Sequence, residues 1–215
     1  MRSLKVAAAL AVVLPIATTA QAHPHVFVDA RSELIFDTLG AVTAVRHTWQ
    51  FDEAFSEYAI QGLDANGDGK LSEAELVPLA KINVESLKDY EFFTGLKVGG
   101  KRQTLLDPNK YWLEFHGGRL TLFYTLPLKA PVSIKGKATL EVYDPQYFVA
   151  FAFKETSVAL KGAPAGCSAT YRPPKQLDNA TMAILGSIPA DQLTLPPELA
   201  DAAAALANLI TLQCP

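Results

Sequence analysis

Twelve consecutive residues, 64–75, place oxygen-bearing side chains at the spacing of an EF-hand calcium loop. Calcium is a hard cation that takes roughly six to eight oxygen ligands, which this alternation of carboxylate, amide and hydroxyl groups can supply. The expected ligands are Asp64, Asn66, Asp68, Lys70, Ser72 and Glu75. Lys70 needs to offer only its backbone carbonyl, Glu75 closes the loop with both carboxylate oxygens, and Gly69 permits the sharp central turn. The spacing therefore predicts Ca²⁺ binding.

The same residues also have a purely structural interpretation. Asp, Asn and Gly are the usual residues of turns, and Ser72 with Glu75 matches a capping box at the start of a helix. The two interpretations are compatible because the second helix of an EF-hand begins at this point. Apolar residues at helical spacing on both sides predict a helix–loop–helix over about residues 52–93. The sequence contains no second calcium loop, and a single hand within a sheet protein favours a stabilising role for calcium over a switching one.

The first 22 residues have the pattern of a secretory signal peptide. Arg2 and Lys5 precede an apolar stretch at residues 6–16, and residues 20–22 (Ala-Gln-Ala) give a small-residue cleavage site. Cleavage after Ala22 predicts an exported chain without a membrane span, because no later segment reaches about 18 apolar residues. The net charge of −3 becomes more negative when both basic residues are lost, which argues against nucleic acid as a partner.

Cleavage at that position would expose a chain that begins His23-Pro24-His25. A free α-amine, with an ordinary pKa of about 7.7–8.0, then stands beside two imidazoles, and copper, nickel, cobalt and zinc accept such nitrogen ligands. Pro24 has no N–H, so the square-planar chelate that uses deprotonated amides cannot form. Two geometries remain: both imidazoles on one side of an extended segment, or a T-shaped copper brace made by the amine and ring of His23 with another histidine. The simpler alternative is a solvated, frayed terminus.

Few other side chains are candidates for such a metal site. His47 and His116 are the only other histidines, and Asp52 and Asp144 are carboxylate candidates. Taken alone, each of these two histidines is more typical of a structural residue than of a ligand. Asp144 is followed by a proline, so a turn residue and a metal ligand or ligand-supporting residue are both open interpretations.

Cys167 and Cys214 are the only cysteines, and both remain after signal cleavage. In an oxidising compartment a single disulfide is expected, which would tie the C-terminus to the end of the main domain. Two separate buried thiols are the alternative, since neither cysteine belongs to a C-x-x-C pair.

Hydrophobic patterning predicts an α+β fold: an antiparallel β-sandwich-like body with an inserted EF-hand helix–loop–helix and a small helical C-terminal tail. Strands are expected at residues 25–37, 42–51, 111–115, 120–126, 132–142, 148–154 and 157–160. The proline-bearing segment 127–131 is expected to be a turn between two of them. The β-rich domain is expected to span residues 23–172, and the tail, residues 173–215, to hold short helices near 179–186 and 197–210.

Four segments in a fixed order carry a resemblance to a known family. They are His23-Pro24-His25-Val26-Phe27, Trp49-Gln50-Phe51-Asp52-Glu53-Ala54-Phe55, the calcium loop, and Tyr143-Asp144-Pro145-Gln146-Tyr147. Together they resemble the bacterial periplasmic family catalogued as domain of unknown function 1007, over nearly the whole mature chain. Members of that family are commonly labelled periplasmic components of ABC-type transport systems and are often encoded beside metal transporters. The resemblance implies a periplasmic accessory in transition-metal handling, with an inner-membrane metal transporter as partner and the first two histidines as ligands.

Three functions follow from these observations. The preferred one is a non-enzymatic accessory, in which calcium shapes the hand and the N-terminus captures or presents a transition metal. The second is a copper-brace enzyme, which needs His47 or His116 to lie within about 2 Å of an ion held by His23. The third is a calcium-stabilised structural or interaction module of the cell envelope. The sequence has no Ser-His-Asp elbow, glycine-rich phosphate loop or paired catalytic glutamates that would indicate hydrolytic or nucleotide chemistry.

Overall fold

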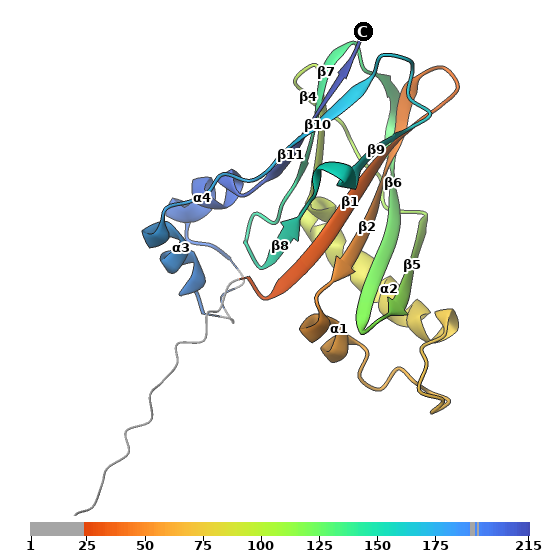
Figure 1. Cartoon of the computed structure of the whole chain (residues 1–215), viewed down its shortest axis with the longest axis vertical. Coiled ribbons are helices and arrows are strands. Elements are labelled where there is room, and N and C mark those ends of the chain that lie inside the picture. Colours follow the sequence, from red (N-terminus) through yellow and green to blue (C-terminus); the bar gives the residue numbers. More distant parts are fainter. Residues whose placement is uncertain (1–23, 190–191, 193) are drawn as a thin grey trace, which may run out of the picture.

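The computed structural model describes residues 24–189, 192 and 194–215. These residues form two β-sheets that enclose a common core, with helices attached around the sheets (Figure 1). The predicted α+β class is confirmed. The predicted signal segment and His23 lie outside the described residues.

The first sheet has the strand order β5-β6-β2-β1-β8, and β9 also pairs with β1. Its strands are β1 (Val26–Phe36), β2 (Ala41–Phe51), β5 (Lys110–His116), β6 (Arg119–Ser133), β8 (Val149–Ala152) and β9 (Val158–Lys161). Every second residue of β1 is buried, as expected for a strand with one face on a core. Asp37 closes the β1–β2 hairpin, because its Oδ1 accepts the backbone N–H groups of Leu39 and Ala41, each at 2.9 Å.

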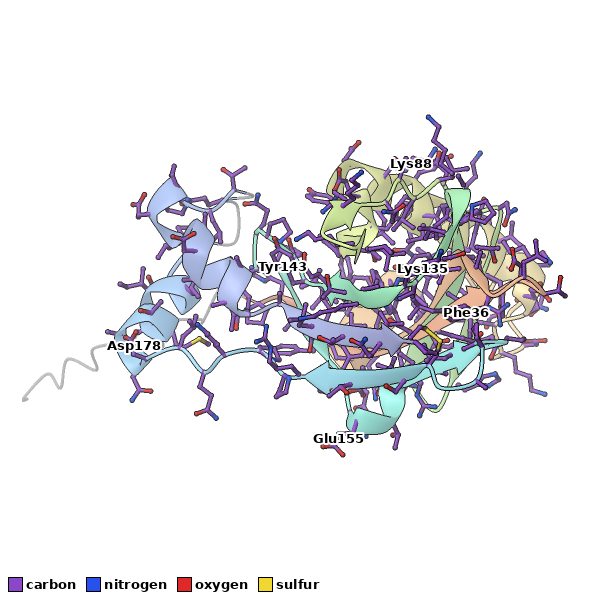
Figure 2. All side chains as sticks on the ribbon, turned by 90° about the horizontal axis from the view of Figure 1, so that it is seen from above. Phe36, Lys88, Lys135, Tyr143, Glu155 and Asp178 are labelled. Atoms are coloured by element: carbon purple, nitrogen blue, oxygen red, sulfur yellow. A yellow bond between two sulfur atoms is a disulfide. The ribbon has the colours of Figure 1, made fainter. Side chains whose placement is uncertain are left out.

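The second sheet has the strand order β10-β11-β7-β3-β4, and each neighbouring pair is antiparallel. Its strands are β3 (Thr94–Val98), β4 (Lys101–Arg102), β7 (Gly136–Val142), β10 (Ser168–Arg172) and β11 (Asn208–Cys214). β11 lies between β10 and β7, so the last strand of the chain is inside the sheet. The predicted pairing of Cys167 with Cys214 is confirmed, and the disulfide is visible as a yellow bond in Figure 2.

The helices on either side of residues 64–72 connect the two sheets. α1 (Glu53–Ala59) and α2 (Glu73–Leu87) follow β2, and the 3₁₀ segment η1 (Lys88–Phe93) leads into β3. Asp52 caps α1, since its Oδ1 accepts the Phe55 N–H at 2.9 Å while its Oδ2 accepts the Phe27 N–H at 2.8 Å. The shorter elements that follow are η2 (Glu155–Ser157), α3 (Asn179–Gly186), η3 (Pro197–Leu199) and α4 (Ala200–Ala205). Within the described residues, no helix has the length and apolarity needed to cross a bilayer.

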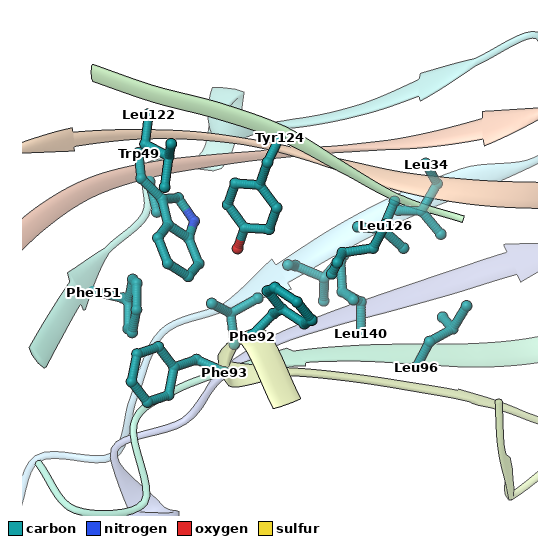
Figure 3. Close-up of a cluster of buried hydrophobic side chains, with 14 of the residues drawn as sticks. Leu34, Trp49, Phe92, Phe93, Leu96, Leu122, Tyr124, Leu126, Leu140 and Phe151 are labelled. Carbon is teal, nitrogen blue, oxygen red and sulfur yellow. The ribbon is translucent and has the colours of Figure 1, made fainter. Parts of the chain in front are cut away.

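The main core lies between the two sheets and extends under α2 (Figure 3). Its largest fully buried side chains include Trp49, Tyr124, Leu34, Leu96 and Leu140. Trp49 meets Tyr124 edge to face, with ring centroids 4.9 Å apart, which is a favourable aromatic geometry. A smaller cluster around Leu185, Ile188 and Leu199 packs α3 against the segment that leads into α4.

The structure corrects three expectations about the β-structure. β8 and β9 pair with β1 in parallel, so the first sheet is mixed rather than antiparallel. Segment 127–131 is not a turn but part of β6, and a register shift between Val42 and Ala44 of β2 accommodates Pro127 there. Residues 208–214 form a strand with alternate residues buried, rather than the end of a helix. The C-terminal tail is therefore partly helical and partly a strand of the second sheet.

Candidate functional site

Residues 64–72 lie in a mostly exposed loop between α1 and α2, residues 73–75 begin α2, and the polar side chains of this segment fold back onto its own backbone. Asp64 Oδ1 accepts the N–H of Gly67 at 2.8 Å, and Asp64 Oδ2 accepts the N–H of Gly69 at 2.9 Å. Asn66 Oδ1 accepts the N–H of Asp68 at 2.9 Å. Gly67 and Gly69 have φ angles of 72° and 75°, in the left-handed region that favours glycine. Side-chain oxygens of the first half of the loop therefore bind backbone N–H groups of the same loop and hold its curvature.

Glu75 closes the other half of the loop from the first turn of α2. Its Oε1 accepts the N–H of Ala65 at 3.0 Å, and its Oε2 accepts the N–H and the hydroxyl of Ser72 at 2.9 and 2.7 Å. Ser72 Oγ accepts the N–H of Glu75 in return, which completes the capping box. The hydrogen bonds from Ser72 lower the pKa of Glu75, so this carboxylate is ionised at neutral pH. One carboxylate thus links the two ends of the loop.

The candidate ligands are all oxygen atoms: the carboxylates of Asp64, Asp68 and Glu75, the amide of Asn66, the backbone carbonyl of Lys70 and the hydroxyl of Ser72, which donates to Glu75. This chemistry fits a hard divalent cation and not a soft thiolate-binding metal. The carboxylates accept backbone N–H groups, and no group of three or more His, Cys, Asp or Glu side chains suited to a metal ion occurs among the described residues. An ionised carboxylate has about four lone-pair sites, so these oxygens retain capacity for a cation.

The loop is fixed to the body through its eighth residue and the start of α2. Leu71 is half-buried against the main core, and it lies with Leu76 beside Leu113 and Phe115 of β5. EF-hands usually pair with a second hand through this loop position. Here β5 lies on that side, so the loop packs against the first sheet instead.

His25 lies half-buried just before β1 and is anchored to the loop between β7 and β8. Its backbone N–H donates to the carbonyl of Phe148 at 2.9 Å, and the two rings have centroids 4.7 Å apart. Asp144 is buried in the same loop, where its Oδ1 accepts the Gln146 N–H at 2.8 Å. Its Oδ2 accepts the N–H groups of Phe148 and Val149, each at 2.9 Å. Phe148 therefore contacts both His25 and Asp144, and the structure brings these two candidates into one neighbourhood.

His47 lies in the core between the sheets and is completely buried. Its Nδ1 is 2.9 Å from Ser32 Oγ and its Nε2 is 3.2 Å from Thr94 Oγ1, while its ring stacks on Tyr124 at 5.1 Å. Burial lowers the pKa of His47 to about 3, so its ring is neutral at physiological pH. Ser32 faces His47 across the β1–β2 pair, and the strand rise places Ser32 roughly 23 Å along β1 from His25.

His116 is exposed at the end of β5, where its Nε2 lies 3.7 Å from Glu114 Oε2. β6 and β2 separate β5 from β1, so His116 lies roughly 14 Å across the sheet from the line of β1. A metal–nitrogen bond is about 2 Å long, so neither His47 nor His116 can share an ion with His25 in this arrangement. Both carboxylate candidates lie near the start of β1: Asp144 binds the N–H of Phe148, which anchors His25, and Asp52 caps α1 and binds the N–H of Phe27.

Two structural features of this region could not be predicted from the sequence pattern. A cavity of about 260 Å³ lies between α1, α2, η1 and the loop of residues 144–149. At its wall, Glu91, Phe92 and Phe93 have φ angles of 49°, 54° and 50°. Non-glycine residues in the left-handed region cost about 1–2 kcal/mol each, so this turn is strained. Glycine or asparagine is the usual sequence marker of such a conformation, and this turn contains neither.

Comparison with known proteins gives a family and two relatives. A family model described as "Protein of unknown function (DUF1007)" matches residues 8–214. An "Uncharacterized 15.5 kDa protein in trpE 3'region" from Spirochaeta aurantia is 33% identical over 99 residues, which cover 46% of this chain and 71% of that protein. An "Uncharacterized protein" from Haemophilus influenzae is 25% identical over 137 residues, which cover 63% of this chain and 65% of that protein.

Proposed function

We propose that this chain, which belongs to the DUF1007 family, is an exported calcium-binding protein that acts as a non-enzymatic accessory in transition-metal handling. Calcium binds the loop of residues 64–75 and stabilises the packing of the hand on β5. The mature N-terminus, beginning at His23, binds copper, nickel, cobalt or zinc. It holds that ion in the periplasm for an inner-membrane metal transporter.

The observation that carries the calcium proposal is the closed form of the loop. Asp64 and Glu75, at its first and last positions, each accept backbone N–H groups from the residues between them. Two glycines at positive φ allow the backbone to curl around the side-chain oxygens. A loop that already has this curvature needs little ordering when an ion binds, so less of the binding free energy is spent on the chain.

The N-terminal metal proposal is supported by the anchoring of His25. The hydrogen bond from His25 N–H to Phe148 and the adjoining ring contact fix the start of the mature chain against the body. An imidazole on a fixed backbone is a better ligand than one on a frayed terminus, because its ordering cost is already met. The buried carboxylate of Asp144 in the same loop adds negative charge near the histidine. A copper-brace enzyme is less favoured, because both ring nitrogens of His47 are engaged by hydroxyl groups in the core.

The first experiment measures thermal unfolding with and without calcium in the wild type, Glu75→Gln and Glu73→Gln. Both substitutions remove one negative charge from the first turn of α2, but only Glu75 occupies a ligand position. If the dissociation constant is about 0.1–1 mM, then 10 mM calcium stabilises the wild type by about 1.4–2.7 kcal/mol. The same stabilisation is expected in Glu73→Gln and none in Glu75→Gln. Equal calcium responses in the two variants would contradict the proposed site.

The second experiment titrates processed protein that begins at His23 with copper, nickel, cobalt and zinc. The comparison proteins carry His23→Ala with His25→Ala, or one additional residue before His23. We expect tight binding that the double substitution abolishes, and weaker binding in the extended protein because its amine no longer adjoins the ring of His23. Calcium binding without transition-metal binding would overturn the metal-handling proposal and leave a calcium-stabilised interaction module of the envelope.

A further inference from the structure

The cavity beside the hand has walls that are almost entirely aromatic and aliphatic. Its volume of about 260 Å³ lies near the lower end of the range for small-molecule sites, roughly 300 Å³, so its occupant has one or two rings rather than a long chain. Six aromatic side chains contribute to the lining, drawn from β2, α1, η1 and the loop before β8: Trp49, Phe51, Phe55, Tyr90, Phe93 and Phe148. Rings from several separate elements therefore converge on one partly open pocket.

The charges around the cavity restrict what can enter it. No lysine, arginine or histidine lines it, and Asp144 is its single ionisable acid among the described residues. Both carboxylate oxygens of Asp144 accept backbone N–H groups. An anionic ligand would give up its hydration at this largely apolar wall, and no lysine, arginine or histidine is among the described residues that line it. The remaining polar lining comes from Asn83, Ser86 and Gln146, which suits an uncharged molecule.

The strained turn in η1 holds part of this wall in place. Phe93 lines the cavity in a left-handed conformation, and its carbonyl accepts the N–H of Tyr143 at 3.1 Å. The carbonyl of Phe92 accepts the hydroxyl of Thr94 at 2.7 Å, which fixes the preceding residue as well. Backbone strain of this kind persists where surrounding contacts enforce it, and it concentrates at ligand-binding sites. The strained backbone of η1 and the apolar lining are therefore two separate features that both favour a ligand-binding cavity.

We propose that the cavity is a binding site for a small, uncharged, largely apolar molecule with one or two aromatic rings. The rings of the wall contact the ligand through face and edge, and a lining without a cationic side chain among the described residues disfavours organic anions. Binding at this site requires neither calcium nor a transition metal, so the inference goes beyond the function proposed above, although Asp144 and Phe148 border both regions.

A matched pair of fluorescent probes tests both parts of this proposal. 1-Naphthylamine is uncharged at neutral pH, and 4-amino-1-naphthalenesulfonate has the same two-ring system with one added sulfonate. We expect saturable binding of the uncharged probe, with a dissociation constant at least tenfold lower than that of the anionic probe. Equal or tighter binding of the sulfonate would overturn the assignment, because it would indicate general exposed apolar surface rather than this cavity.

Two pairs of variants locate the probe. Ser86→Phe fills the cavity from α2, whereas Lys81→Phe adds the same ring to the exposed face of that helix. We expect at least a tenfold loss of affinity for the uncharged probe in Ser86→Phe and less than a twofold change in Lys81→Phe. Similar affinities in the two folded variants would refute the assignment.

The second pair removes a ring instead of adding one, and it remains informative if Ser86→Phe does not fold. Tyr90 lines the cavity but is 43% exposed, so truncation to alanine leaves the core intact. Tyr58, on α1 and 74% exposed, does not line it and serves as the control. Tyr90→Ala is expected to weaken uncharged-probe binding at least threefold, while Tyr58→Ala leaves it unchanged. Unchanged affinity in Tyr90→Ala would count against the cavity.

Discussion

The buried imidazole of His47 makes the stability of this protein sensitive to acid. In the folded protein its pKa is about 3, because burial disfavours the charged form, whereas the unfolded chain titrates near the ordinary value of 6.5. Between these values the unfolded state binds more protons than the folded state, so stability falls as the pH is lowered. The contribution is complete above about pH 6.5 and is progressively lost down to about pH 3.

The size of the effect follows from this difference in pKa. Each unit is worth about 1.36 kcal/mol, so the full loss from neutral pH to below pH 3 is about 4.8 kcal/mol. Between pH 7 and pH 4, the range accessible to most assays, the loss is about 3 kcal/mol. A domain with a total stability of about 5–15 kcal/mol would lose a substantial part of it through one residue.

The assay is urea unfolding at pH 7, 6, 5 and 4, followed by tryptophan fluorescence. His47→Gln removes the titrating ring, while His116→Gln removes an exposed histidine and serves as the control. We expect the wild type and His116→Gln to lose about 3 kcal/mol more than His47→Gln between pH 7 and pH 4. Carboxylates titrate in all three proteins and cancel in the comparison. Parallel pH profiles for the wild type and His47→Gln would refute the reasoning.

Three further predictions concern contacts that hold the candidate sites in place, each measured by urea unfolding at pH 7 in the presence of a chelator. Ser56→Ala leaves the buried N–H of Leu120 without its 2.9 Å acceptor and should cost about 1–3 kcal/mol, whereas alanine at an exposed serine should cost almost nothing. Replacing Cys167 and Cys214 together by serine opens a link across 47 residues and should cost about 4 kcal/mol; a loss below about 1 kcal/mol would contradict the chain-entropy argument. Asp144→Asn sets an amide NH₂ against backbone N–H donors and should cost about 1.5–3 kcal/mol, and an unchanged midpoint would show that these hydrogen bonds contribute little.

The strands of the first sheet were predictable because alternation of buried and exposed residues is a local pattern. β1 shows it over its full length, and the Asp37 turn marks its end. Pro127 was misleading because proline lacks a backbone donor and usually ends a strand; the register shift next to its partner Ala44 explains how β6 continues. The strand at residues 208–214 was hidden by the preceding alanine-rich helix, and its place between β10 and β7 depends on partners distant in sequence.

The candidate sites also differ in whether they depend on neighbouring residues or on contacts between distant parts of the chain. The turn-rich segment 64–75 and its capping box were predictable because the hydrogen bonds that close it lie within twelve positions, while calcium binding there stays a prediction. The contact of His25 with Phe148, and the presence of Asp144 beside them, depend on the pairing of β1 with β8. The burial of His47 against Ser32 and Thr94 likewise arises from two sheets that meet only in the folded chain. Periodicity alone could not show which histidine belongs to the core.

The element that joins the local loop to the assembled cavity is α2. Its first turn contains Glu75, and its last turns contribute Asn83, Ser86 and Leu87 to the cavity wall. Its fifteen residues span about 22 Å. Calcium and an apolar ligand would each bias the position of α2, so any effect of one on the affinity for the other must be reciprocal. Leu76 is buried and lies beside β5, which opposes a large movement of α2 away from the first sheet. We therefore expect calcium to change the affinity for the apolar ligand by making the cavity wall more rigid, and not by displacing α2.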